Sequence, residues 1–266
     1  MLKQRILTAV PLAAAFLAAL FYLPFSAFAG LIAVLLLLAG WEWGGLAGLR
    51  AGPRIAFLPV LALLLGALLP QRGQLESWVF PLSLGLWAFL SLLVLTFPRS
   101  APVLRGTGLR LGLAVLVLAP AYLAVLDLYS AGPAYLLWAL GVVWAADIGA
   151  YFAGRRFGKR KLAPAVSPGK SWEGAFGGIA SALLVSLAFA DVLSVPWGAS
   201  LLLFTVLMAV LSIFGDLFES VLKRTAGVKD SGGLLPGHGG VLDRLDALLP
   251  ALPLAALGLG ALPSAG

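Results

Sequence analysis

The chain has 266 residues, 61% of them apolar and only 11% charged, and it carries a formal net charge of +7. A water-soluble fold of this size cannot hide so much apolar surface, so the composition excludes a soluble enzyme and a disordered chain and predicts an all-α polytopic membrane protein. The lack of cysteine excludes disulfides, thiol nucleophiles and cysteine-ligated zinc, and the basic charge needs no nucleic-acid partner, because basic residues collect on the cytoplasmic side of membrane proteins.

About nine transmembrane helices are expected, because nine apolar segments are each long enough to cross the bilayer. Pro250 and Pro253 fall inside the last segment and should bend it. We take the chain as one membrane unit with an N-terminal transmembrane region, 1–130, and a C-terminal catalytic region, 131–266. The nine segments run near residues 6–24, 27–48, 54–70, 77–97, 107–128, 131–152, 172–192, 196–218 and 245–262.

The basic residues predict the orientation of these segments. With the N-terminus in the cytoplasm, 17 of the 18 lysines and arginines lie on the cytoplasmic side, and only Arg72 lies outside. We therefore expect the N-terminus inside, the C-terminus outside, and a location in the cytoplasmic membrane. The first segment also imitates a secretion signal, but it is long for one and a second span follows at once, so we expect it to be retained.

Two cytoplasmic regions hold most of the polar residues. Residues 147–173 and 216–246 together contain 10 of the 18 basic residues and 7 of the 11 acids. Loops that only orient the helices would explain the bases and would leave the acids unexplained. Charges gathered near helix ends in a membrane protein indicate a functional site.

The end of the eighth segment predicts one polar helix face. Asp216, Glu219, Ser220 and Lys223 recur at i, i+3, i+4 and i+7. A bare carboxylate at the end of an apolar helix is costly, so Asp216 should meet a cation or a basic partner.

A second pair of carboxylates, Asp243 and Asp246, stands three residues apart at the start of the ninth segment. Hard oxygen ligands without histidine or cysteine suit Mg²⁺, which usually also binds substrate phosphates. The alternative for Asp216 and Asp243 is a structural ion pair with Arg244 or Lys223.

Between these acids lie the groups that a polyphosphate needs: basic side chains at separated points and glycines that let backbone N–H groups approach. They are Lys223, Arg224, Lys229, Asp230, His238, Gly239 and Gly240. Upstream, Lys170 and Ser171 could contact phosphate where the seventh helix begins. The sequence Gly169-Lys170-Ser171 is not a Walker loop, because Pro164 stands where that motif needs glycine and no strand precedes it.

The pattern as a whole resembles the signature of the phosphatidate cytidylyltransferases, also called CDP-diacylglycerol synthases. Residues 147–174 are similar to a second block of that family, and the N-terminal half agrees in its span number and in Trp41-Glu42-Trp43. One departure is Ser171, where threonine is more usual. The signature runs Ser220-x₂-Lys223-Arg224-x₄-Lys229-Asp230-x-Gly232-x₂-Leu235-Pro236-x-His238-Gly239-Gly240-x₂-Asp243-Arg244-x-Asp246.

The resemblance implies a reaction in phospholipid biosynthesis, in which phosphatidic acid and CTP give CDP-diacylglycerol and pyrophosphate with Mg²⁺, and possibly a second cation. It implies that Asp216 and Asp243 hold metal, with Asp246 as a weaker ligand. It further implies phosphate contacts from Lys170, Lys223, Arg224, Lys229 and Arg244, a nucleotide or loop role for Asp230 and His238, and a homodimer.

Two other functions fit parts of the sequence. A CTP-dependent lipid kinase, or a cytidylyltransferase with another lipid acceptor, would share the CTP apparatus. A secondary transporter would use Asp147, Asp216 and Glu42 as intramembrane relays. The chain has no inverted repeat and its acids gather at cytoplasmic ends, so the transporter is the less favoured function.

Overall fold

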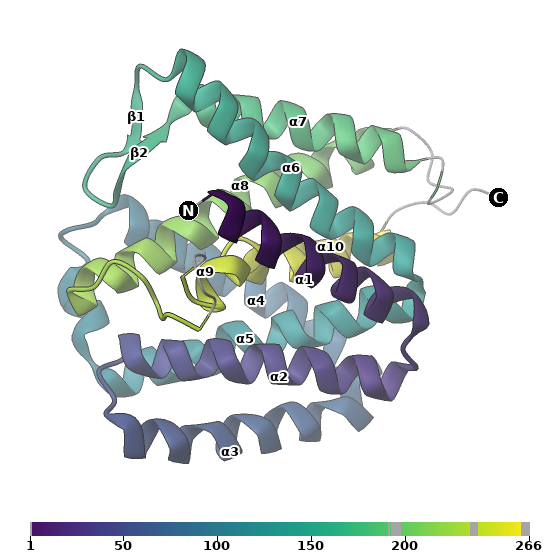
Figure 1. Cartoon of the computed structure of the whole chain (residues 1–266), viewed down its shortest axis with the longest axis vertical. Helices are drawn as coiled ribbons and strands as arrows, with labels where there is room; N and C mark the ends of the chain where they lie inside the picture. The colour runs from purple at the N-terminus through teal and green to yellow at the C-terminus, as the bar shows by residue number, and fades with distance from the viewer. Residues whose placement is uncertain (1, 191, 193–197, 235–238, 262–266) are drawn as a thin grey trace.

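Long helices run back and forth between two ends of the molecule (Figure 1). The computed structural model describes residues 2–190, 192, 198–234 and 239–261. Within these residues lie nine helices of 14 residues or more, one for each of the nine predicted segments. The helices are α1 (Leu2–Tyr22), α2 (Phe25–Leu46), α3 (Ala51–Leu68), α4 (Arg72–Leu95), α5 (Thr107–Ala131), α6 (Pro133–Phe157), α7 (Trp172–Ala190), α8 (Ala199–Ala226), the short α9 (Leu242–Leu245) and α10 (Leu248–Ala261), with the 3-10 turns η1 (Leu69–Gln71) and η2 (Ala101–Arg105).

The chain is an all-α polytopic membrane protein by the length and apolar composition of these helices. Six stretches of the described residues are long and apolar enough to cross a bilayer. One of them, Ala51–Leu95, has 45 residues and would be about 68 Å long as a straight helix, more than twice the hydrocarbon thickness of about 30 Å. It contains both α3 and α4, and η1 interrupts it.

The last predicted segment, 245–262, corresponds to α10, which begins three residues later than expected. The short helix α9 precedes it and was not predicted, and Asp246 and Ala247 form a break between the two helices. Pro250 then falls in the first turn of α10, where its missing N–H costs no hydrogen bond, and Pro253 is the proline inside the helix. The break separates Asp243, on α9, from the apolar α10 that follows.

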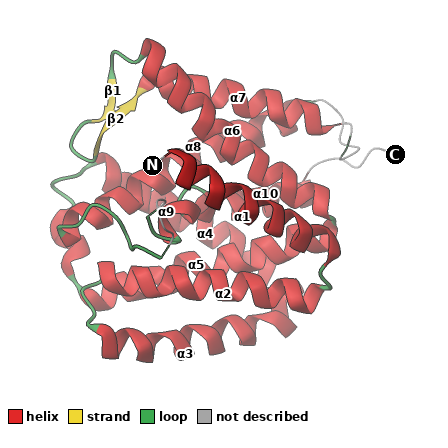
Figure 2. Ribbon diagram, in the orientation of Figure 1, coloured by secondary structure: helices red, strands yellow, loops and turns green. Residues whose placement is uncertain are grey.

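A small β-hairpin was not predicted. Strands β1 (Lys161–Ala163) and β2 (Ser167–Ser171) pair antiparallel and lead directly into α7, and Figure 2 shows them at one end of the helices. The backbone N–H groups of Lys159 and Arg160 donate to the Glu173 carboxylate at 3.0 and 3.2 Å, which fixes the hairpin to the first turn of α7.

Side-chain contacts identify the two ends of the helix bundle. At one end the Arg72 guanidinium donates to the Ser130 hydroxyl at 3.0 Å and lies 4.3 Å from the centre of the Phe25 ring. At the other end Arg110 donates to the carbonyl oxygens of Leu46 and Leu104. The β-hairpin and residues 227–234, which follow α8, lie at this second end (Figure 1).

Helix α5 forms the centre of the molecule, with 72% of its most apolar stretch buried. Helices α6 and α7 form the closest pair, because small residues face each other. A Cβ on Gly178 would lie 2.6 Å from the Ala146 carbonyl oxygen, so only glycine allows the two backbones to approach this closely. The α6–α7 pair carries the hairpin, and α8 packs against it.

Candidate active site

At the end of α8 that is predicted to face the cytoplasm, a lysine lies between two carboxylates. Lys223 Nζ lies 2.6 Å from Glu219 Oε2, one turn earlier on α8, and 2.7 Å from Asp243 Oδ1, on α9. The structure therefore brings together the two halves of the predicted signature. The proposed alternative of an ion pair between Asp243 and Lys223 is present in the structure.

The end of α8 is set by a glycine. Gly227 has φ +73°, a left-handed conformation that favours glycine, and the N–H groups of Gly227 and Val228 bond the carbonyl oxygens of Arg224 and Lys223. The helix thus stops one turn after Lys223. The chain can then turn back so that α9 reaches the same lysine.

Both carboxylate oxygens of Asp243 accept hydrogen bonds. Its Oδ2 accepts the backbone N–H groups of Gly240, at 2.8 Å, and Ser231, at 3.2 Å. Gly239 has φ +82°, and a Cβ there would lie 2.9 Å from Asp243 Oδ2. Burial acts to raise the pKa of the Asp243 carboxyl, but the hydrogen bonds from Lys223 and from the Gly240 N–H outweigh it and hold that pKa below its usual range. Asp243 is a carboxylate at neutral pH.

A second ion pair lies beside the first. Lys170 Nζ, on β2, is 2.7 Å from Asp216 Oδ2, on α8. The next residue, Ser171, is buried, and its Oγ accepts the Gly174 N–H at 3.2 Å, so it caps the start of α7. Ser220 Oγ is 3.5 Å from Asp216 Oδ1. The prediction that Lys170 lies where α7 begins agrees with the structure, and its partner is an acid of the signature region.

The Lys170–Asp216 pair borders a polar cavity of about 400 Å³. Helices α6, α7 and α8 and the β-hairpin line it. The lining residues are Asp147, Ala150, Tyr151, Gly154, Arg155, Leu162, Gly169, Lys170, Ser171, Gly174, Ala175, Ile213 and Asp216. The cavity thus places Asp216, the first residue of the region 216–246, against the polar residues of 147–173.

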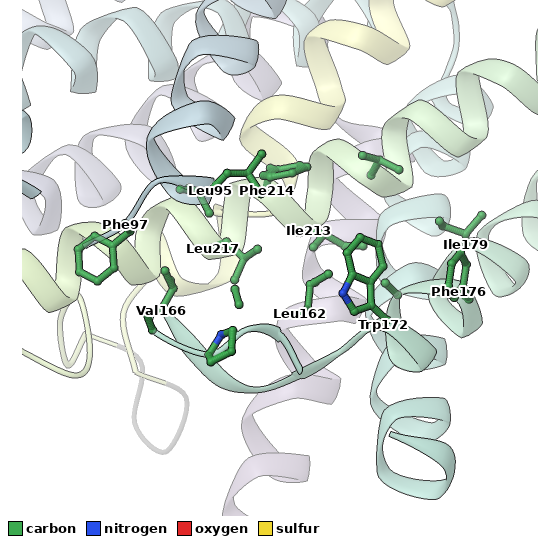
Figure 3. Close-up of a pocket in the computed structure, with 16 residues that line it drawn as sticks. Leu95, Phe97, Leu162, Val166, Trp172, Phe176, Ile179, Ile213, Phe214 and Leu217 are labelled. Atoms are coloured by element: carbon green, nitrogen blue, oxygen red, sulfur yellow. The ribbon is translucent and has the colours of Figure 1, made fainter. Parts of the chain in front are cut away.

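An apolar groove adjoins this cavity. It encloses about 290 Å³ between the β-hairpin, α4, α7 and α8 and is lined by hydrophobic side chains (Figure 3). Leu162, Ala175 and Ile213 line both spaces, so the groove and the polar cavity share a wall. Trp172 and Phe176 reach into the groove from α7, and Leu217 and Ile213 from α8 (Figure 3).

Other predicted site residues that the structure describes do not line the polar cavity. Arg224 is exposed, and its Nε donates to the Val166 carbonyl oxygen at 3.4 Å, which ties the end of α8 to the hairpin. Lys229, Asp230 and Arg244 are exposed on the surface. Among the described residues, Lys229 and Asp230 form no hydrogen bond or ion pair. His238 lies outside the described residues.

The carboxylates outnumber the lysines that face them. Asp246 lies in the electrostatic field of Asp216 and Glu219, and its Oδ1 accepts the Ala247 N–H at 2.7 Å. Glu219 Oε1 is buried without a hydrogen-bond partner among the described residues. In the part of the chain that the structure describes, no three acids or histidines converge as a metal site. The surplus of hard oxygen atoms nevertheless fits a divalent cation whose remaining ligands come from a substrate.

Two residues of this site were not assigned by the sequence. Glu219 was placed on the polar face of α8 and given no role, although it pairs with Lys223. Glu42 was noted only as part of a family element and as a transporter relay, yet it is 2% exposed and its carboxylate accepts the Leu242 N–H at 2.8 Å. The signal for Glu42 was an acid inside an apolar segment.

Known proteins match almost the whole chain. Residues 3–261 match the cytidylyltransferase family. The phosphatidate cytidylyltransferase of Pseudomonas aeruginosa is 45% identical over 259 residues, which cover 96% of this chain and 95% of that protein. The phosphatidate cytidylyltransferase of Haemophilus influenzae is 40% identical over 288 residues, covering 95% of this chain and 96% of that protein. The one from Bacillus subtilis is 46% identical over 134 residues, about half of each chain.

Proposed function

The chain belongs to the cytidylyltransferase family, and we propose that it is a nucleotidyltransferase that makes CDP-diacylglycerol and pyrophosphate from phosphatidic acid and CTP. Full-length similarity to proteins named phosphatidate cytidylyltransferase confirms the resemblance drawn from residues 220–246. It favours this enzyme over the transporter.

One structural observation carries the proposal: the polar cavity that the Lys170–Asp216 ion pair borders shares a wall with an apolar groove. A lipid whose acyl chains occupy the groove would present its phosphate to the cavity. The cavity of about 400 Å³ would receive the triphosphate of CTP from the other side. The two substrates, one in the bilayer and one in water, would then meet beside Lys170 and Asp216.

The chemistry asks for positioning and charge neutralisation rather than a protein nucleophile. An oxygen of the lipid phosphate attacks the α-phosphorus of CTP, the bond from that phosphorus to the bridging oxygen breaks, and pyrophosphate leaves. Lys170 and Lys223 would stabilise the negative charge on the phosphates, with further contacts from Arg224, Lys229 and Arg244. The backbone N–H groups of Gly239 and Gly240, the hydroxyls of Ser171 and Ser220, and the side chains of Asp230 and His238 would orient the nucleotide and its loop.

Asp216, Asp243 and Asp246 would hold Mg²⁺, and possibly a second cation, together with substrate oxygens. A bound divalent cation supplies Lewis-acid stabilisation of the phosphates. Lys170 and Lys223 contact one oxygen of Asp216 and of Asp243, respectively, which leaves acceptor positions on both carboxylates for a cation. The same ion pairs hold both lysines at positions from which they would neutralise phosphate charge.

We propose that the protein lies in the cytoplasmic membrane with its N-terminus and active site toward the cytoplasm and its C-terminus outside. The basic residues around the hairpin and the end of α8, against the single Arg72 at the opposite end, support this orientation. The homodimer that the family resemblance implies stays a prediction.

The test is the fate of labelled CTP. Purified protein in neutral detergent receives phosphatidic acid and CTP labelled at either its α- or its γ-phosphorus, with Mg²⁺ or with a chelator. We expect the lipid product to carry the α-label, pyrophosphate to carry the γ-label, and both to vanish with the chelator. A lipid that carries the γ-label would identify a kinase and overturn the proposal. Other lipid acceptors, tested in parallel, would reveal a different lipid specificity.

A further inference from the structure

Glu42 is a buried acid that the reaction does not explain. It lies in the last part of α2, almost 200 residues before the signature segment, and it is 2% exposed. Its Oε2 accepts the Leu242 N–H at 2.8 Å and the Ser231 hydroxyl at 3.2 Å. It therefore bonds both described flanks of the segment 231–242.

Two glycines in the described flanks of this segment lie close to the Glu42 carboxylate. A Cβ on Gly232 would lie 2.2 Å from Glu42 Oε1, and a Cβ on Gly240 would lie 2.4 Å from Glu42 Oε2. Both contacts are closer than side-chain atoms tolerate, so any residue larger than glycine would displace the carboxylate. Because Gly232 and Gly240 have no side chain, they leave the space that the Glu42 carboxylate occupies.

The contacts of Glu42 and Asp243 interlock. The Ser231 hydroxyl donates a hydrogen bond to Glu42, and the Ser231 backbone N–H donates one to Asp243. The Leu242 N–H donates to Glu42, and Leu242 directly precedes Asp243 in the chain. Loss of the Glu42 contacts would free both flanks, and with them the N–H groups that hold the Asp243 carboxylate.

The contacts of Glu42 depend on the length of its side chain rather than on its charge. Its donors are a backbone amide and a hydroxyl, both neutral. The ion pairs among the described residues join Lys170 to Asp216 and Lys223 to Glu219 and Asp243, and none includes Glu42. A neutral side chain of the same length could accept both hydrogen bonds, whereas aspartate would be one methylene too short.

We propose that Glu42 is a positioning residue, which clamps the flanks of the segment 231–242 from α2 so that Asp243 and Lys223 keep their geometry. The proposal rests on the proposed function for its effect on catalysis. The clamp itself is a property of the fold and can be measured without turnover.

The experiment compares Glu42→Gln with Glu42→Asp in full-length protein in detergent. Glu76→Gln is the carboxylate control, because Glu76 lies one turn after Arg72 on α4, at the opposite end of the molecule. We expect Glu42→Gln to keep kcat within about threefold of wild type and Glu42→Asp to lose at least about tenfold, since a misplacement of about 1 Å can cost up to about a hundredfold. The KM for phosphatidic acid should stay unchanged, because the groove lies apart from Glu42. The control should match wild type.

Hydrogen–deuterium exchange supplies the readout that does not depend on activity. In Glu42→Asp the amides of Ser231, Gly240 and Leu242 should exchange faster than in wild type, while those of the hairpin 161–171 stay unchanged. Ser231→Ala, which removes only the hydroxyl donor, should show the same change on a smaller scale. It replaces Glu42→Asp in this experiment if that variant does not fold.

If the wild-type enzyme fails to transfer a cytidylyl group but the exchange changes as expected, the proposed function fails and the clamp stands. Unchanged exchange in both variants, or a Glu42→Gln variant as inactive as Glu42→Asp, would overturn the clamp.

Discussion

Lys223 and Asp243, 20 positions apart in the sequence, are joined by an ion pair of 2.7 Å. The pair links the end of α8 to α9, and Glu219 completes it from the previous turn of α8. Loss of the lysine would leave two carboxylates facing each other, so the lysine has a structural role before any substrate binds. Its position two helical turns after Asp216, on the same helix, makes it the first residue to test as a phosphate contact.

Lys223→Ala and Arg224→Ala should each lower kcat/KM for CTP by at least about a hundredfold, because groups that clamp developing phosphate charge contribute several kcal/mol. Steady-state kinetics in neutral detergent measures this without attraction to anionic lipid. Lys161→Ala is the matched control, an exposed lysine on β1 outside the signature, and should stay near wild type. Equal small losses in all three variants would show that these bases only orient the helices.

The Lys170–Asp216 pair should behave as one unit. Lys170→Ala and Asp216→Ala should each lose activity, and the double variant should lose less than the product of the two effects, with a coupling of at least about 0.5 kcal/mol. A double-mutant cycle on kcat/KM measures this. Lys161→Ala combined with Asp216→Ala is the control and should be additive. Additive losses for Lys170→Ala and Asp216→Ala would show that the two residues act independently of each other.

The apolar groove should bind the lipid and leave CTP unaffected. Phe176→Ala removes a ring that reaches into the groove and should raise the KM for phosphatidic acid several-fold while the KM for CTP stays constant. Phe89→Ala removes a similarly exposed ring from α4 and is the control. A change in the KM for CTP alone would contradict the assignment of the groove.

The natural lack of cysteine makes the orientation directly measurable. Single cysteines at Lys161, on the hairpin, and at Gln74, beside Arg72, should react from opposite sides of the membrane with an impermeant maleimide. We expect Gln74→Cys to react in intact cells and Lys161→Cys to react only after the membrane is opened. Labelling of both from the same side would refute the orientation.

The sequence predicted the helices well because each is a long apolar run, and lipid removes most alternatives to a helix. It also placed Asp216, Glu219, Ser220 and Lys223 on one face, because helical spacing is a local property. The short helix α9 was not predicted, because Asp243, Arg244 and Asp246 interrupt the apolar pattern just before the last segment.

Contacts between distant parts of the chain could not be predicted from spacing. The partner of Lys170 is Asp216 because the β-hairpin folds back onto α8, and five residues of β2 carry no signal strong enough to predict a strand. Glu42 reaches Leu242 across 200 residues, and only the packing of α2 against α9 brings them together. The glycines of the signature were read as phosphate contacts, and Gly240 also makes room for Glu42.

The central claim is that cytidylyl transfer to phosphatidic acid depends on the carboxylate of Asp243. The most direct measurement is the rate at which α-labelled CTP enters the lipid in Asp243→Asn, beside Glu76→Gln, which removes one carboxylate charge at the opposite end of the molecule. Asp243→Asn keeps the shape of the side chain but weakens its hold on Mg²⁺ and on Lys223. We predict a loss of more than about tenfold, which corresponds to more than about 1.4 kcal/mol of barrier, in a protein that still inserts and folds, and a control near wild type. An Asp243→Asn enzyme that keeps more than about a tenth of the wild-type rate would contradict the account.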